Sequence, residues 1–244
     1  MNNELKTMKN EPKKGGFSLT EILLAVGTLG IGMLFIAGTF LAGIHFSTIS
    51  AEQTTAAIAA DEAFAKIQLY SINLTNLAAD QLKPYEALRS IDPNEFAYPS
   101  TNIDASHKQY YWSALCRLLD SSTATRLVQV TIFVSRKVGS AASYRGGKGW
   151  PIPMQVVISG NTGSNSLAIT EADNRTWIND GYTIVDNKTG QIYRVLKRDA
   201  DQPNLVILDR PWQGSPADSV WVVPPPIGGG RNPTIAIYQK VIRF

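Results

Sequence analysis

An acidic side chain stands where an apolar stretch of this sequence begins, and a basic, glycine-rich segment precedes it. The carboxylate belongs to Glu21, and residues 22–44, which follow it, contain no charged residue. Residues 13–20 read KKGGFSLT, which places two lysines and two glycines just ahead of Glu21. A carboxylate in or near lipid is costly unless a partner neutralises it. We therefore expect Glu21 to have a partner, and we expect the preceding segment to do more than orient a membrane anchor.

The uncharged stretch is long enough to cross a bilayer. A helix rises ~1.5 Å per residue, so a hydrocarbon core of ~30 Å requires about twenty apolar residues. The stretch is longer than the core of a secretory signal, and no A-x-A-like cleavage site follows it. Lysines precede it in the sequence. The positive-inside rule therefore places the N-terminus in the cytoplasm and the chain after Phe46 on the opposite side of the membrane.

The sequence KKGGFSLTEILLAV resembles the class III signal of type IV prepilins and of the pseudopilins of type II secretion. In that family a membrane aspartyl peptidase cuts after the last glycine and N-methylates the new first residue. The resemblance implies cleavage between Gly16 and Phe17, methylation of Phe17, and pairing of Glu21 with the terminal amine of a neighbouring subunit. Because glycine has no side chain, the backbone at Gly16 can lie close against a protease. The residues that the peptidase would recognise are Lys13, Lys14, Gly15 and Gly16.

The resemblance also implies a location and a set of partners. It places a single-pass protein in the bacterial inner membrane, with a cytoplasmic N-terminus and a periplasmic or extracellular head. The implied partners are the prepilin peptidase, other pilin or pseudopilin subunits, the inner-membrane assembly platform and the lipid bilayer. Major pilins often carry a membrane-segment proline and a C-terminal cysteine pair, whereas this chain has no proline from Phe17 up to Pro84 and one cysteine. The IGML run at 31–34 is similar to the IGLL of minor pilins and minor pseudopilins, so we favour a minor component over the bulk filament subunit.

The rest of the sequence predicts an α+β protein with a long N-terminal helix and a β-rich C-terminal part. The resemblance implies that this helix packs on a pilin-like antiparallel β-sheet head, and the length of the chain leaves room for an added β-module. One apolar stripe at helical spacing supports a helix beyond the membrane: Ala57, Ala60, Phe64, Ile67 and Leu74. β-Branched and aromatic runs predict strands at 110–115, 127–134, 154–159, 167–170, 182–185, 191–196, 205–208, 220–223 and 234–242. The last of these is expected to return to the first sheet. The predicted parts are a leader (1–16), a membrane and assembly helix (17–45), its amphipathic extension (46–78), a connecting region (79–106), a sheet with its loop (107–149) and a β-rich module (150–244).

Catalysis finds little support in the sequence, and we predict neither an enzyme nor a cofactor. The net charge of +3 is small and argues little for nucleic acid binding. The two histidines, His45 and His107, belong to no metal or protease motif, and no G-x-S-x-G run occurs. The single cysteine, Cys116, excludes an intrachain disulfide and is expected to be a small buried residue.

The alternative to a structural subunit is a membrane-anchored binding module whose C-terminal β-region recognises a secreted substrate, a surface or DNA. Exposed tryptophans at 177, 212 and 221 would favour binding, whereas their burial would favour a plain core. Three aspartates, at 199, 201 and 209, match no EF-hand spacing and are better explained by a solvated turn than by calcium. A modest basic cluster is better explained by a solvated loop than by DNA contact: Arg136, Lys137, Arg145 and Lys148. We therefore predict no nucleic-acid, metal or small-molecule ligand.

Overall fold

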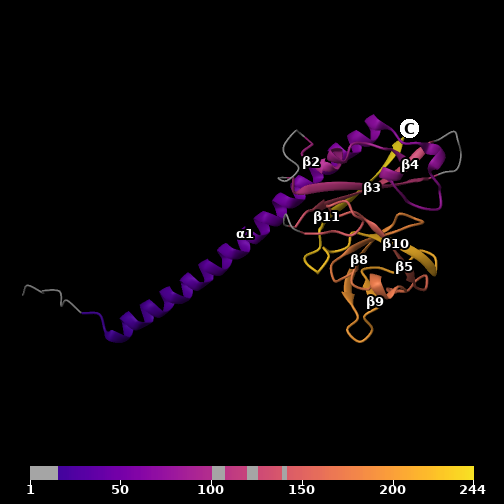
Figure 1. Cartoon of the computed structure of the whole chain (residues 1–244). Helices are drawn as coiled ribbons and strands as arrows, with labels where there is room; N and C mark the ends of the chain where they lie inside the picture. Colours follow the sequence, from indigo (N-terminus) through magenta and orange to yellow (C-terminus); the bar gives the residue numbers. More distant parts are fainter. Residues whose placement is uncertain (1–15, 101–107, 120–125, 139–141) are drawn as a thin grey trace, which may run out of the picture. The chain divides into compact units, whose positions relative to one another are not determined.

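The computed structural model describes residues 16–100, 108–119, 126–138 and 142–244. The chain divides into two compact units, residues 1–50 and residues 51–244. One helix, α1, spans Leu19–Tyr70, so that its first part belongs to the first unit and its second part to the second unit (Figure 1). The other described helices and the described strands all belong to the second unit.

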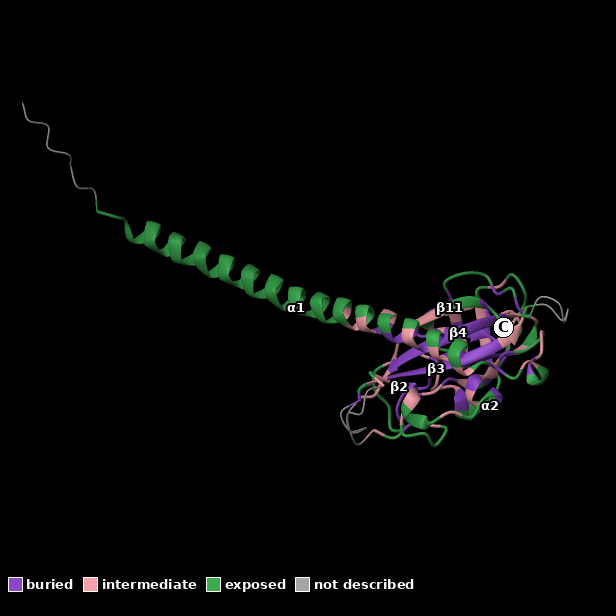
Figure 2. Cartoon of the chain, turned by 90° about the horizontal axis from the view of Figure 1, so that it is seen from above, coloured by how far each residue is buried: buried purple, intermediate pink, exposed green. Residues whose placement is uncertain are grey.

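The first part of α1 is apolar on every side. Every described residue from 16 to 48 is exposed, as Figure 2 shows in green. This part is long and apolar enough to cross a membrane, with a mean hydropathy of 2.1 and no buried residue in its most apolar window. The prediction of one N-terminal apolar helix of membrane-spanning length is confirmed.

The second part of α1 has one buried face. The predicted stripe is confirmed at Ala60, Phe64 and Ile67, whereas Ala57 is half-buried and lies beside the stripe. Most of the buried positions are alanines, whose small side chains let the helix backbone approach the neighbouring sheet. The buried side chains of α1 are Ala56, Ala59, Ala60, Ala63, Phe64 and Ile67.

The helix is shorter than the sequence predicts, because it ends at Tyr70 and not near residue 78. Ser71 adopts a left-handed φ of 63°, while its N–H still bonds the carbonyl of Ile67 at 3.0 Å. Glycine usually takes this position at a helix end, so the sequence carries no signal for the stop. Leu74, expected on the helix, begins a separate short helix, η1 (Leu74–Asn76), and is half-buried.

A five-stranded antiparallel sheet forms beside this helix. Its order is β1-β3-β4-β11, and β2 also pairs with β3. The long strands are β3 (Tyr110–Leu118), β4 (Leu127–Arg136) and β11 (Thr234–Arg243). The last strand of the chain therefore returns to the first sheet, as the sequence predicts. In consequence the predicted module of 150–244 is not one spatial part, because its final strand belongs to this sheet.

The sheet lies between two other layers of the second unit, so β3 and β4 are buried on both faces. Trp112 and Val130 project from one face into the core that contains Ala60 of α1. Leu115 and Phe133 project from the opposite face and pack against side chains of the barrel described next. Side chains of successive strand residues point to opposite faces, which explains why these two sets interleave in the sequence.

The third layer is a closed barrel of six antiparallel strands in the order β10-β5-β6-β9-β8-β7. Its strands are β5 (Met154–Ser159), β6 (Ser166–Ile169), β7 (Thr183–Asp186), β8 (Ile192–Arg198), β9 (Leu205–Leu208) and β10 (Ala217–Val222). A short helix, η4 (Ala172–Asn174), lies between β6 and β7. Buried side chains such as Ile158, Tyr193 and Trp212 form the core inside the barrel.

Each of the nine strands that the sequence predicts exists, and its ends differ from the prediction by no more than three residues. The connecting region contains two strands that the sequence does not reveal, β1 (Lys83–Pro84) and β2 (Ala97–Tyr98). Two residues are too few to show the alternation that marks a strand. The same region holds α2 (Tyr85–Leu88) and η2 (Pro93–Phe96).

Candidate processing and assembly site

The N-terminus of α1 is capped by a reciprocal pair of hydrogen bonds. The N–H of Glu21 donates to the hydroxyl of Ser18 at 3.2 Å, and the N–H of Ser18 donates to the carboxylate of Glu21 at 3.5 Å. This is the capping box, in which Ser at the N-cap and Glu three residues later satisfy backbone donors that the helix leaves unpaired. The Ser18 hydroxyl also lies 2.8 Å from the hydroxyl of Thr20. Glu21 therefore has a local structural role in addition to any role between subunits.

The predicted processing residues lie directly before this cap. Gly16 and Phe17 are exposed, and apart from Gly16 and its two chain neighbours no described residue has an atom within 4 Å of the position that a Cβ at Gly16 would occupy. Lys13, Lys14 and Gly15 lie outside the described residues. Among the ion pairs of the described part, none involves Glu21. The structure thus brings Glu21 to Ser18 and places the backbone between Gly16 and Phe17 in the open.

The capping role of Glu21 was not predicted from the sequence. The signal was present, since Ser-x-x-Glu ahead of an apolar run is typical of a helix N-terminus. The cap with Ser18 and the expected ion pair with a neighbouring subunit both use the carboxylate of Glu21. They differ in what they require of it, because a capping residue needs an acceptor oxygen whereas an ion pair needs a negative charge.

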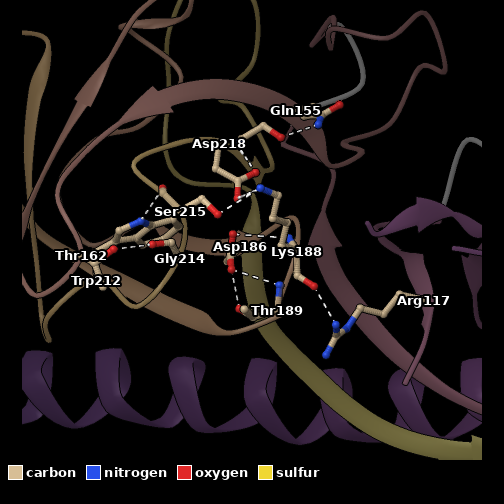
Figure 3. Close-up of polar contacts among 11 residues, drawn as sticks. Arg117, Gln155, Thr162, Asp186, Lys188, Thr189, Trp212, Gly214, Ser215 and Asp218 are labelled. Carbon is tan, nitrogen blue, oxygen red and sulfur yellow. Dashed lines mark hydrogen bonds and ion pairs between the residues drawn. The ribbon is translucent and has the colours of Figure 1, made fainter. Parts of the chain in front are cut away.

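A second polar arrangement lies where the barrel meets the sheet (Figure 3). Asp186, at the end of β7, is fully buried, and its carboxylate accepts the N–H groups of Lys188 at 3.4 Å and of Thr189 at 3.1 Å. The hydroxyl of Thr189 also donates to this carboxylate. Gly190 completes the turn with a φ of 71°, and a Cβ there would lie 2.7 Å from Nε2 of Gln129 on β4. The turn between β7 and β8 therefore fits closely on the sheet.

The carbonyl groups of this turn accept hydrogen bonds from the sheet. Arg117 on β3 donates to the carbonyl of Lys188 at 2.7 Å, and Gln239 on β11 donates to that of Gly190 at 2.8 Å. Burial lowers the pKa of the Arg117 guanidinium, although Asp186 opposes that shift. Asp186 shapes the turn, and Arg117 and Gln239 bind the turn to the sheet, so the cluster has a structural explanation.

The predicted basic cluster consists of residues with separate surroundings. Arg136 forms an ion pair with Glu52, and Lys148 forms one with Glu86 at 2.6 Å. The guanidinium of Arg145 lies over a tryptophan ring, 5.2 Å from its centre. Because three of the four predicted cations already have partners of their own, the structure favours the solvated-loop interpretation over a surface for DNA.

The three tryptophans belong mainly to the core. Trp212 is fully buried inside the barrel, and Trp221 is buried in the cluster between barrel and sheet. Trp177 is half-buried beneath the guanidinium of Arg145. Since burial of these tryptophans was expected for a plain core and exposure for a binding module, this arrangement favours a plain core over an exposed aromatic binding patch.

The aspartates considered for calcium serve turns and strands. The carboxylate of Asp199 accepts the N–H groups of Asp201 and Gln202, both at 2.9 Å. Asp209 accepts the N–H of Arg194 on β8 at 3.0 Å. Within the described ranges, no group of three or more His, Cys, Asp and Glu residues is placed to hold a metal ion.

The remaining candidates also have simple surroundings. Cys116 is fully buried in the core beside α1, and burial raises the pKa of its thiol. His45 is exposed on α1, with its ring 6.2 Å from that of Phe46. His107 lies outside the described residues. No family model, no curated protein and no solved structure matches this chain.

Proposed function

We propose that the chain is a type IV pilin-like structural subunit, a minor pilin or a pseudopilin, that prepilin peptidase processes and that assembles into a filament. One observation carries this proposal. The segment KKGGFSLTE leads directly into a capped helix in which, after Glu21, residues 22–44 are uncharged and exposed. A plain anchor has no need of a glycine pair, an aromatic residue and a carboxylate at this junction.

The exposure of the apolar helix supports an assembly role. A helix that is hydrophobic all round must be buried in lipid or against other helices. Under this proposal lipid covers it before assembly, and the helices of neighbouring subunits cover it in the filament. The N-terminus then lies in the cytoplasm and the head lies in the periplasm or outside the cell. The assembly platform of the inner membrane would extract the subunit from lipid.

The head fits a structural subunit as well. The second part of α1 packs on an antiparallel sheet whose long strands come from the middle and the end of the chain. The barrel is inserted in the sequence between β4 and β11, and side-chain hydrogen bonds from β3 and β11 fasten it to the sheet. Such an insertion gives the subunit an additional surface without changing how the helix packs on the sheet.

Mass spectrometry of the protein purified from cells with active prepilin peptidase tests the proposal. We expect a chain that begins at an N-methylated Phe17. Replacing Gly16 by Leu should block cleavage, because the added side chain keeps the backbone away from the peptidase. Replacing Gly43 by Leu is the matched control, since Gly43 lies on the exposed helix far along the chain from the cut. A wild-type protein that keeps Met1 in such cells would refute the proposal.

A further inference from the structure

The described residues of the second unit expose one long strand edge. The barrel is closed, so it has no edge, and β1 and β2, which pair with β3, are two residues each. By contrast β11 has ten residues and pairs with β4 alone. An edge strand presents a row of unpaired N–H and C=O groups with which another chain can pair.

The register identifies the free backbone groups of β11. The N–H of Phe244 bonds the carbonyl of Arg126 at 3.1 Å, and the pairing of Lys240 with Val130 continues the same phase. Residues of an antiparallel strand alternate between pointing toward the partner strand and away from it. Even-numbered residues after the bulge near Thr234 therefore bond to β4, and odd-numbered ones point outward. The outward residues are Ile237, Gln239, Val241 and Arg243.

These outward groups have no other backbone partner in the part of the chain that the structure describes. The side chains beside them give the edge a chemical character. Residues 219–244 contain no acidic residue, and both cations of β11, Lys240 and Arg243, are exposed. Lys240 pairs with Asp61 at 2.8 Å, but the side chain of Asp61 is 73% exposed, so the pair stays solvated. Val241 lies between the two cations and is 55% exposed.

We propose that the outer edge of β11 docks an extended acidic segment of another polypeptide by strand addition. The main chain of the segment bonds to the outward groups from Ile237 to Arg243, and its acidic side chains lie opposite Lys240 and Arg243. Opposite charges across a strand pair stabilise it, and like charges destabilise it. A second copy of β11 carries the same cations and is therefore the poorer partner. The inference uses the second unit alone and does not depend on processing or filament assembly.

Two labelled peptides, TEVVEVT and TKVVKVT, whose charged residues are three positions apart as Lys240 and Arg243 are, test the inference on the full chain in detergent micelles. The acidic peptide should bind at least about tenfold more tightly than the basic one, since two favourable charge pairs replace two unfavourable ones. Added salt should weaken its binding. Amide hydrogen exchange at Ile237, Gln239 and Val241 should slow when the acidic peptide is bound. Fluorescence anisotropy measures the first two effects, and mass spectrometry or NMR measures the third.

A pair of variants at one position separates strand addition from simple charge attraction. Val241→Pro removes an outward N–H that β4 does not use, so the fold should persist while peptide binding falls by about tenfold or more. Val241→Thr keeps the N–H and the branched shape, and it should bind like the wild type. Equal binding of both peptides, no binding of either, or unchanged binding by Val241→Pro would overturn the inference. Slow exchange of these amides without peptide, together with a dimer in solution, would instead assign the edge to a second copy.

Discussion

The two parts of α1 are one continuous helix, but they are built for different surroundings. The first part carries large apolar side chains on all sides, and Leu24 and Phe35 are both more than 70% exposed. The second part carries its apolar side chains on one face, where Ala59 and Ala63 are fully buried. After Glu21 the next charged residue is Glu52, which forms an ion pair with Arg136 of β4. The pattern of charge, and not helix propensity, thus distinguishes what covers each part.

Placing a charge on each part of α1 should affect membrane association very differently, and this is the largest effect that we expect. Leu34→Lys puts an ammonium group near the middle of the uncharged stretch, where insertion becomes less favourable by ~3 kcal/mol. Ile58→Lys adds the same group to an exposed position of the second part and should leave membrane association unchanged. Alkaline extraction of membranes, followed by quantification of the pellet, measures the difference. If both variants were retained in the pellet to the same extent, the first part would not depend on lipid for its cover.

Alkaline pH should weaken the head and leave the apolar part of the helix unaffected. Burial raises the pKa of Tyr85 from 10.0 to about 12, and its hydroxyl donates to the carbonyl of Ser71 at 3.4 Å. The unfolded chain therefore loses this proton first. The contribution of Tyr85 to stability is complete below pH 10 and decreases by about 3 kcal/mol at most as the pH rises through 12.

The variant Tyr85→Phe isolates that contribution, because other buried tyrosines, such as Tyr111 and Tyr193, also have raised pKa values. The wild type should lose more stability than the variant between pH 10 and pH 12, as measured by urea denaturation followed by tryptophan fluorescence. Parallel curves for the two proteins would show that Tyr85 ionises equally easily in the folded and unfolded chains.

Enlarging one alanine in each part of α1 should have a smaller effect, and this effect concerns the stability of the head. Ala59→Leu adds three carbon atoms to a fully buried position and should destabilise the head by ~1–3 kcal/mol. Ala37→Leu makes the same change on the exposed part and should leave the unfolding midpoint of the head unchanged. Circular dichroism during thermal unfolding measures both. A lower midpoint for Ala37→Leu would mean that the first part of α1 contributes to the stability of the head.

The sequence revealed the two parts of α1 unequally well. The absence of charge marks the first part without ambiguity, so its existence and extent could be predicted. The end at Tyr70 could not, because Ser71 supplies a left-handed conformation that glycine usually signals. Individual barrel strands were predictable from β-branched runs. Closure of the barrel was not, since the pairing of β7 with β10 joins segments that are distant in sequence.

The candidate site shows the same limit. Gly16, Phe17 and Glu21 were identified from their order in the sequence, and their processing and assembly roles remain predictions. The Ser-x-x-Glu spacing is also a sequence signal for hydrogen bonds between Glu21 and Ser18, but the geometry was needed to establish that both bonds form. The order of the residues therefore identified the segment before the apolar helix, and the geometry established that Glu21 also caps this helix.

Three variants at this junction separate the two uses of Glu21, with the smallest expected effect on the fold. Glu21→Gln keeps an acceptor oxygen for the cap and removes the charge, whereas Glu21→Ala removes both. Ser18→Ala removes the capping hydroxyl at a cost of about 1 kcal/mol to the helix start and keeps the charge. If a neighbour's terminal amine needs the carboxylate, both Glu21 variants should lose about tenfold or more in incorporation, the loss expected for a hydrogen bond to a charged group. Ser18→Ala should then assemble like the wild type.

The measurement is co-purification with partner subunits at equal membrane levels, after mass spectrometry has established that each variant is cleaved before Phe17. Cleavage should survive in all three, because the residues on both sides of the cut are unchanged. Normal incorporation of Glu21→Gln beside poor incorporation of Glu21→Ala and Ser18→Ala would assign the carboxylate to the cap. In that case the axial position of the subunit would have to be set by contacts other than an ion pair at Glu21.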